Sequence, residues 1–135
     1  MTNQCVTKGF HHAAMKVADY DAVVAFYRDG LGFTEKISWG EGDGRAIMLD
    51  AGNGNYLEVF AGGQPASGDG HVMHLAFRVA NCDEALARAV AAGARVTMEP
   101  KDVTIPSRPE PTPVRIAFCA GLAGEIMEFF QNDKT

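Results

Sequence analysis

Residues 10–33 read FHHAAMKVADYDAVVAFYRDGLGF, and residues 71–94 read HVMHLAFRVANCDEALARAVAAGA. Both stretches carry the same signals in the same order: alternating side chains, a capping Asp or Asn, apolar residues at three-to-four spacing, and a terminating Gly. The alternation predicts a β-strand, and the three-to-four spacing predicts a helix that follows it. We therefore infer an internal repeat, which is the strongest single clue to a fold.

The two copies keep the same parity when His12 is aligned with His74. The shared parity predicts that one face of each first strand is more polar than the other. Phe10, His12, Ala14 and Lys16 form this face in one copy, and His74, Ala76 and Arg78 form it in the other. His11 is expected to point to the opposite face and to pack or hydrogen-bond there.

Three further strand candidates follow each copy, separated by glycine-rich turns. They span 33–39, 45–50 and 55–60 in the first half, and 95–99, 114–119 and 125–131 in the second. The pattern predicts an α+β fold in which two βαβββ halves, about 10–62 and 71–131, form a curved mixed sheet. A chain of 135 residues is the size of one domain, so we expect a single domain over 1–135.

Two segments lie outside the repeat. Residues 61–70 are rich in small side chains and are expected to link the halves. Residues 101–113 contain four prolines and are expected to form a long, extended loop that belongs only to the second half. Long loops in compact domains often act as lids or binding loops.

Composition excludes several classes of function. The chain is 47% hydrophobic and 21% charged, with a formal net charge of −5 and no run of Lys and Arg. Such a field disfavours nucleic acid and anionic membranes, and no apolar stretch is long enough to span a bilayer. The cysteines are odd in number and have no CxxC spacing, which favours reduced thiols and a cytoplasmic protein. They are Cys5, Cys82 and Cys119.

The chemistry is concentrated at four repeat-equivalent positions. His12 and His74 lie on the first strands, and Glu58 and Glu128 lie on the last strands with matching parity. Alone, each His fits a hydrogen-bonded core residue and each Glu fits a solvated strand position. Together they predict a site for one divalent metal ion, with Ni, Co, Zn, Mn and Fe all compatible with imidazole and carboxylate ligands. Whether the four meet within one chain or across two is left open.

The segments FHHAAMKVADYDAVVAFYRDGLGF, NYLEVF, HVMHLAFRV and GEIMEFF resemble the vicinal oxygen chelate superfamily, also called the glyoxalase/bleomycin resistance/dioxygenase superfamily. Its members include glyoxalase I, methylmalonyl-CoA epimerase, extradiol dioxygenases and fosfomycin-resistance enzymes. The resemblance extends from about Phe10 to Gln131. It implies that the metal ligands are His12, Glu58, His74 and Glu128.

This ligand set looks most like that of glyoxalase I, because the epimerase usually has Gln where Glu58 stands and the other two classes use three ligands. The resemblance therefore implies a metal-dependent lyase or isomerase of the lactoylglutathione lyase type. In that reaction a carboxylate moves a proton through a metal-stabilised enediolate, with Glu128 as the expected base and Glu58 as the alternative. Other readings are an epimerase, an extradiol dioxygenase, an antibiotic-modifying enzyme or a non-catalytic binding protein.

A small-molecule substrate is expected beside the metal. Candidate substrate-binding residues are Lys16, Arg78, Arg115, Tyr56 and Phe130, although each cation also fits a solvated surface position. Lys16 falls where bacterial glyoxalase I has an Arg that contacts a substrate carboxylate. A homodimer is expected by analogy with small members of the superfamily.

Overall fold

A computed structural model describes residues 4–30, 32–65, 72–122 and 126–135. Its elements are β1 (Thr7–Lys16), α1 (Tyr20–Ala25), η1 (Phe26–Gly30), β2 (Thr34–Trp39), η2 (Gly42–Gly44), β3 (Ala46–Asp50), β4 (Tyr56–Phe60), β5 (Val72–Val79), α2 (Cys82–Ala91), β6 (Arg95–Ile105), β7 (Thr112–Ala120) and β8 (Ile126–Gln131). Leaving aside the two short turns η1 and η2, the order βαβββ occurs twice, which confirms the predicted α+β fold.

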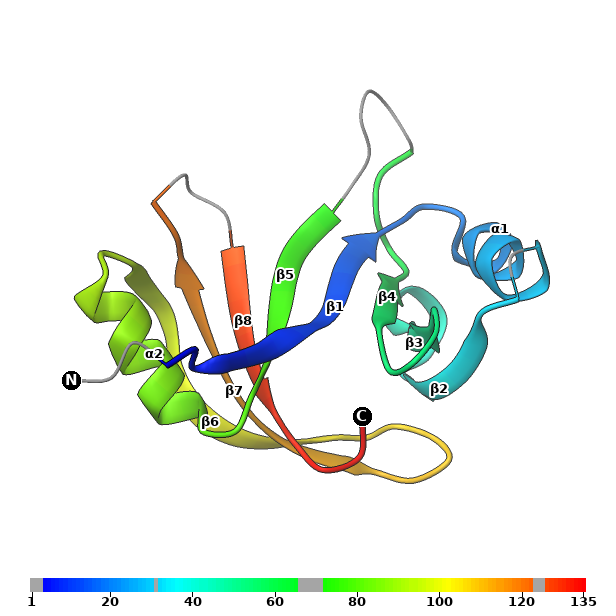
Figure 1. The fold of residues 1–135 in the computed structure, drawn as a ribbon. Coiled ribbons are helices and arrows are strands. Elements are labelled where there is room, and N and C mark those ends of the chain that lie inside the picture. The colour runs from blue at the N-terminus through cyan, green and yellow to red at the C-terminus, as the bar shows by residue number, and fades with distance from the viewer. Residues whose placement is uncertain (1–3, 31, 66–71, 123–125) are drawn as a thin grey trace.

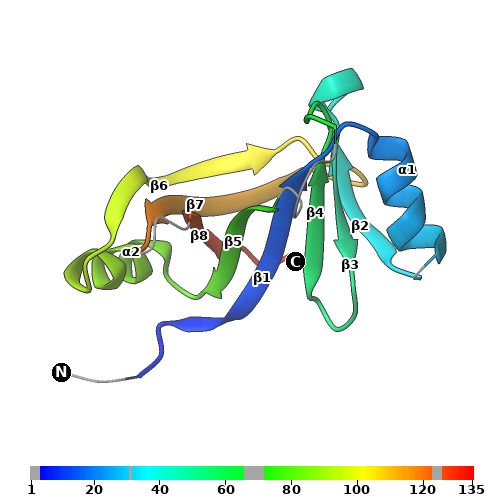
Figure 2. The same ribbon diagram turned by 90° about the horizontal axis from the view of Figure 1, so that it is seen from above.

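The strands form one mixed sheet with the order β2-β3-β4-β1-β5-β8-β7-β6. Each half supplies four adjacent strands, and the halves meet where β1 pairs antiparallel with β5. Within each half, the first strand pairs parallel with the last, β1 with β4 and β5 with β8. The sheet curls, and α1 and α2 lie on its outer face at opposite ends (Figures 1 and 2). The two central strands of the sheet, β1 and β5, therefore carry the two expected His ligands.

Side-chain caps start both helices where the sequence places them. The Asp19 carboxylate accepts a hydrogen bond from the backbone of Ala22, and the Asn81 amide oxygen accepts one from the backbone of Glu84. α2 ends before Gly93, as predicted. The first helix was expected to reach about Leu31, but regular α-helix stops at Ala25 and a wider turn continues to Gly30. Leu31 itself lies outside the described residues.

The prediction of a loop at 101–113 is wrong for most of these residues. β6 continues to Ile105 and pairs with β7 from Thr112 onward, so only 106–111 form a turn. Two features accommodate prolines in these strands: a register shift occurs around Pro100, and β7 pairs with β8 only from Arg115 on, beyond Pro113. The turn reaches back to β2, where the backbones of Ser38 and Arg108 form two hydrogen bonds of 3.0 and 2.6 Å. The β6–β7 hairpin therefore spans the concave side of the sheet.

Apolar clusters cover both faces of the sheet. On the outer face, α1 packs on a cluster that includes Ile47, Leu49 and Val59, and α2 packs on a second cluster around Ala117 and Phe129. On the concave face, a third cluster joins the halves and contains Ile37, Met48, Tyr56, Val114 and Phe130. The concave face was expected to be polar, but it is partly apolar, because strands of both halves place these apolar side chains on it beside the four repeat-equivalent residues.

The remaining boundaries agree with the predicted ones to within a few residues. Part of the predicted linker, residues 66–70, lies outside the described residues, as do His71 and residues 123–125 before β8. Among the helices of the described part of the chain, none has the length and apolar character needed to cross a membrane.

Candidate metal centre

Four side chains from four strands meet on the concave face. Nε2 of His12 lies 2.9 Å from Nε2 of His74, 3.3 Å from Oε1 of Glu58 and 3.0 Å from Oε1 of Glu128. Nε2 of His74 lies 3.7 Å from the same Glu58 oxygen and 3.1 Å from the same Glu128 oxygen. All four belong to one chain, so the structure forms this cluster without a second subunit.

The sheet register explains this convergence. Ala76 lies between His12 and Glu128 on the neighbouring strands, and Ala14 lies between His74 and Glu58. Both alanines have no exposed surface. Residues in register on adjacent strands share a face, so each alanine separates two donors without filling the space above them. The two arrangements are copies related by the repeat.

The cluster is nearly excluded from water, with exposed fractions of 2% for His12, 4% for each carboxylate residue and 9% for His74. Burial alone would lower the pKa of His12, but the carboxylates of Glu128 and Glu58 raise it to about 9. Burial likewise opposes ionisation of Glu128, yet its contacts with His12 and His74 hold its pKa below the ordinary value. The ionised Glu128 carboxylate is therefore held at a buried position that attracts positive charge.

The donor set fits a divalent cation. His12, Glu58 and His74 offer ligand atoms within 4.8 Å of one another, and Glu128 adds a fourth oxygen beside both imidazoles. Neighbouring ligands about 2.1 Å from a six-coordinate ion are about 3.0 Å apart, close to the separations among His12, His74 and Glu128. Two carboxylates would also neutralise a charge of two, which buried ions require.

His11 is a neighbour of the cluster that sequence reasoning placed on the wrong face. β1 contains a bulge between Phe10 and His12, because these two residues pair with the adjacent residues Phe77 and Ala76 of β5. Phe10 was predicted to share a face with His12. It lies instead on the outer face, where the centroid of its ring is 5.0 Å from that of the Phe77 ring. Gly9, with φ of +94°, is a signal that could have revealed the bulge.

The His11 ring is fully buried and holds the ligand imidazole in place. Its Nδ1 lies 2.7 Å from Nδ1 of His12, and its Nε2 is hydrogen-bonded to the Thr135 hydroxyl. Burial, with smaller effects from His12 and Arg78, lowers the pKa of His11 to about 2, so the ring is neutral. A neutral His12 that presents the Nε2 lone pair to an ion carries its proton on Nδ1 and donates it to His11.

Two of the predicted substrate-binding residues pack against these rings. Phe130 lies 4.1 Å from the His11 ring and 5.3 Å from the His12 ring, between ring centroids. The centroid of the Tyr56 ring lies 5.1 Å from that of the His11 ring. Both are buried, so in this structure they support the imidazoles.

The predicted cations lie in three different environments. Lys16 is exposed at the end of β1, with its aliphatic chain near Gly62. Arg78 lies in register with Phe130 on the concave face, and its guanidinium is 5.4 Å from the Tyr56 ring. The sheet runs antiparallel between their strands, so Lys16 and Arg78 flank the cluster at opposite ends.

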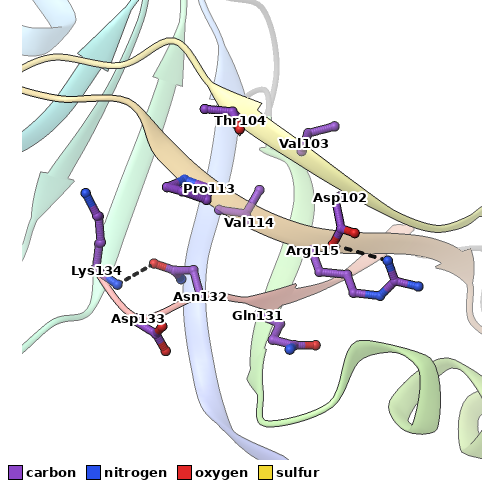
Figure 3. A pocket seen from close by; sticks show the side chains of 10 residues that line it. All are labelled: Asp102, Val103, Thr104, Pro113, Val114, Arg115, Gln131, Asn132, Asp133 and Lys134. Carbon is purple, nitrogen blue, oxygen red and sulfur yellow. Dashed lines mark hydrogen bonds and ion pairs between the residues drawn. The ribbon is translucent and has the colours of Figure 1, made fainter.

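Arg115 does not join the cluster. It alternates with Val114 on β7 and is held by Asp83 of α2 at 2.7 Å and by Asp102 of β6 at 3.2 Å. These hydrogen bonds raise its pKa above the ordinary value. Figure 3 shows the guanidinium beside Asp102. Both residues line a hollow of about 340 Å³, which Asp133 also lines. The sequence indicated a cation here but not the two acidic partners that bind it.

Comparisons with known proteins extend these observations. The model of the Glyoxalase/Bleomycin resistance protein/Dioxygenase superfamily matches residues 9–109. No curated protein matches the sequence. Among solved structures, methylmalonyl-CoA epimerase from Mycobacterium tuberculosis is similar with a TM-score of 0.74 and 21% identity, over 98% of this chain and 93% of that one.

Two more structures share the fold. A variant of Streptomyces coelicolor methylmalonyl-CoA epimerase in complex with 2-nitronate-propionyl-CoA has a TM-score of 0.69 and 24% identity, over 93% of this chain and 98% of that one. A hypothetical protein from Bacillus halodurans has a TM-score of 0.67 and 16% identity, over 93% and 95%. The repeated βαβββ order, the four converging side chains and the matching family model agree, and the chain belongs to the Glyoxalase/Bleomycin resistance protein/Dioxygenase superfamily.

Proposed function

We propose that the chain is a metal-dependent enzyme that moves a proton on the carbon next to a carbonyl, and that its reaction is an epimerisation. The observation that carries the proposal is the convergence of two imidazoles and two carboxylates around one buried point. His12, His74, Glu58 and Glu128 would hold the ion. Bound there, a divalent ion would polarise the substrate carbonyl and so acidify the neighbouring C–H bond.

The arrangement of the carboxylates favours epimerisation. Inversion of a carbon centre requires removal of a proton from one face and return of a proton to the other. Glu58 comes from β4 and Glu128 from β8, on opposite sides of the central β1–β5 pair. In the proposed reaction Glu128 accepts the proton, the electron pair of the broken C–H bond forms the C=C bond of an enolate, and the carbonyl π pair moves to the oxygen. Protonated Glu58 then delivers a proton to the opposite face of the α-carbon, and the C=O bond forms again.

The similar structures support this choice at the level of the fold, since two of those named above are methylmalonyl-CoA epimerases. We therefore propose an acyl thioester with an acidic α-carbon as the first substrate to test. The glyoxalase I type of reaction, first predicted from the sequence, remains the second candidate. Glu58 favours the glyoxalase I type, because the ligand set of this chain, with two carboxylates, looks like that of glyoxalase I. The glyoxalase I reaction also moves a proton on a carbon next to a carbonyl.

The test measures both chemistries on metal-loaded protein. A single epimer of methylmalonyl-CoA in deuterated water should be converted to a mixture of both epimers and should gain deuterium at the α-carbon. NMR measures the incorporation of deuterium. The hemithioacetal of methylglyoxal and glutathione should give no thioester product. Thioester formation without α-carbon exchange would reject the epimerase proposal in favour of the lyase.

Substitution of each carboxylate assigns its role. Glu128→Gln is expected to retain the fold and to lower kcat by about 10²-fold or more, because a general base is lost. Glu58→Gln is expected to retain exchange of one epimer with solvent while inversion is lost. Glu99→Gln is the control, because it removes one exposed carboxylate from β6. Full turnover in the Glu128 variant would remove this residue from the base role.

A further inference from the structure

The chain that follows β8 turns back to β1 and contacts the ring beside the candidate metal centre (Figure 1). The Thr135 hydroxyl is hydrogen-bonded to Nε2 of His11, and Nδ1 of His11 lies 2.7 Å from Nδ1 of His12. The other ring nitrogen of His12, Nε2, faces the carboxylates of the centre. A continuous line of side chains therefore connects Thr135 to the centre through His11 and His12.

Asn132 ends this line with an atom that can only accept hydrogen bonds. Its Oδ1 lies 2.8 Å from the backbone nitrogens of both Lys134 and Thr135, and 3.2 Å from the Thr135 hydroxyl oxygen. Figure 3 shows the contact between Asn132 and Lys134. Because two backbone N–H groups donate to this atom, it is the amide oxygen and not the amide nitrogen. In its contact with Asn132, the Thr135 hydroxyl is therefore the donor.

This contact fixes the direction of every hydrogen bond along the line. A hydroxyl has one proton, so Thr135 donates it to Asn132 and accepts from Nε2–H of His11. A neutral imidazole also has one ring proton, so Nδ1 of His11 is left to accept from Nδ1–H of His12. In a neutral His12 the lone pair is then on Nε2, the nitrogen that faces the centre.

The opposite direction would create a conflict at both ends of the line. His11 would donate from Nδ1 to His12, and the proton of a neutral His12 would be on Nε2, where it blocks an ion. At the other end, Thr135 would donate to His11, and its oxygen would face the Asn132 oxygen at 3.2 Å with no proton between them. Only the first direction gives each acceptor a donor.

Local and long-range contacts hold the segment in place. The Asn132 side chain closes a turn onto the backbone of the residues that follow it, which is a common role of Asn. Nζ of Lys134 lies 2.6 Å from Oε1 of Glu110 and 3.4 Å from the carbonyl oxygen of Pro111, both in the β6–β7 turn. Thr135 is half-buried and His11 is fully buried, so little water reaches this end of the line.

We propose that Thr135 is a positioning residue, whose hydrogen bonds to His11 and Asn132 fix the ring proton of His12 on Nδ1 and keep Nε2 free to bind a divalent ion. Thr135 acts through two rings and touches neither the ion nor the substrate. The consequence for metal affinity rests on the proposed metal centre. The order of protons along the line does not, because it follows from hydrogen bonds within the chain.

The first experiment locates the ring protons by two-bond ¹H–¹⁵N correlation NMR of labelled protein, metal-free and loaded with diamagnetic Zn²⁺. We expect His11 to carry its proton on Nε2 in both forms, and zinc-bound His12 to carry its proton on Nδ1. In Thr135→Val the Nε2–H of His11 loses its acceptor, so this proton should exchange faster with water, and Thr135→Ser should restore slow exchange. A His11 proton on Nδ1 in the wild type, or unchanged exchange in Thr135→Val, would overturn the proposal.

The second experiment measures Ni²⁺ affinity by competition with a chromogenic chelator. Thr135→Val should lower the affinity by about three- to tenfold, at or below the usual range for groups that orient a ligand directly. Thr135→Ser retains the hydroxyl and should recover wild-type affinity. Thr112→Val is the matched control, because it removes a buried threonine hydroxyl that is hydrogen-bonded to Ser107, and it should leave the affinity unchanged.

The outcomes separate the proposal from the metal centre on which it acts. Wild-type affinity in Thr135→Val, or an equal loss in Thr112→Val, would reject Thr135 as a positioning residue. Failure of Ni²⁺ to bind the wild type would reject the metal centre and the expected effect on affinity. The proton order measured in metal-free protein would still stand in that case.

Discussion

Substitution of Ala76 by Val tests whether the two alanines define the space for the ion. Ala76 has no exposed surface and lies in register between His12 and Glu128. Facing Cβ atoms on adjacent strands are about 4.5–5.5 Å apart, and a valine methyl extends about 1.5 Å beyond Cβ. The new methyls would then lie about 3–4 Å from the Cβ atoms of the two ligands, at or inside the contact distance of about 3.5–4.0 Å.

The structure gives two expected magnitudes for this change. Overpacking of a buried position should lower the free energy of unfolding by about 1–3 kcal/mol. Displacement of two ligands by a few tenths of an ångström exceeds the tolerance of about 0.2 Å in metal–ligand distances. We therefore expect the affinity for Ni²⁺ or Zn²⁺ to fall by about 10–100-fold, as for other residues that orient metal ligands.

The matched control is Ala117→Val. Ala117 is also fully buried in the same sheet, but it packs on the outer face against α2. Both variants should lose stability in urea titrations of metal-free protein, and only Ala76→Val should lose metal affinity, measured by competition with a chromogenic chelator. Unchanged affinity in Ala76→Val, together with a loss of stability equal to that of Ala117→Val, would refute the reasoning.

Two further predictions follow from the same geometry. His11→Phe keeps an aromatic ring against Phe130 but removes the hydrogen bond to His12, so metal affinity should fall by about tenfold or more in the same competition assay; wild-type affinity would show that His11 only packs. Arg115→Met should lower Tm at neutral pH and leave metal affinity unchanged, because Arg115 holds the pKa of Asp83 below its ordinary value. That stabilisation is present above the unfolded pKa of Asp83 and is lost as acid protonates the folded-state carboxylate, whose pKa is lower. A thermal melt series should therefore show the Tm difference shrink as the pH falls below the ordinary value of 3.8. A Tm difference that stays constant across this series would contradict the pairing.

The repeat made most of the fold predictable. Strand and helix periodicities, Asp19 and Asn81 as caps, and glycine-rich turns are local signals that depend on a few neighbouring residues. The pairing of His12 with His74 followed from the similarity of two segments, because copies of one unit occupy equivalent places in a symmetric sheet. The order of the strands and the convergence of the four side chains agree with that reasoning.

The errors arose where an interaction distant in sequence changed a local pattern. Strict alternation placed His11 away from His12, but the bulge after Gly9 turned both rings toward the concave face. Proline content predicted a loop after residue 100, yet pairing with β7 extended β6 to Ile105. In both cases the partner strand determined the outcome, and a window of one strand contains no information on its partner.

By itself the amino-acid sequence determined that this protein has two equivalent βαβββ units and that two imidazoles and two carboxylates occupy matching positions in them, since periodicity and repetition are properties of the linear chain. Tertiary structure alone decided that these groups meet within one subunit, that Arg115 is bound by acidic partners, and that Nη1 of Arg78 is buried without one. Burial and ion pairing depend on which residues approach through space, and that information exists only after the sheet has curled and the hairpin has crossed its concave face.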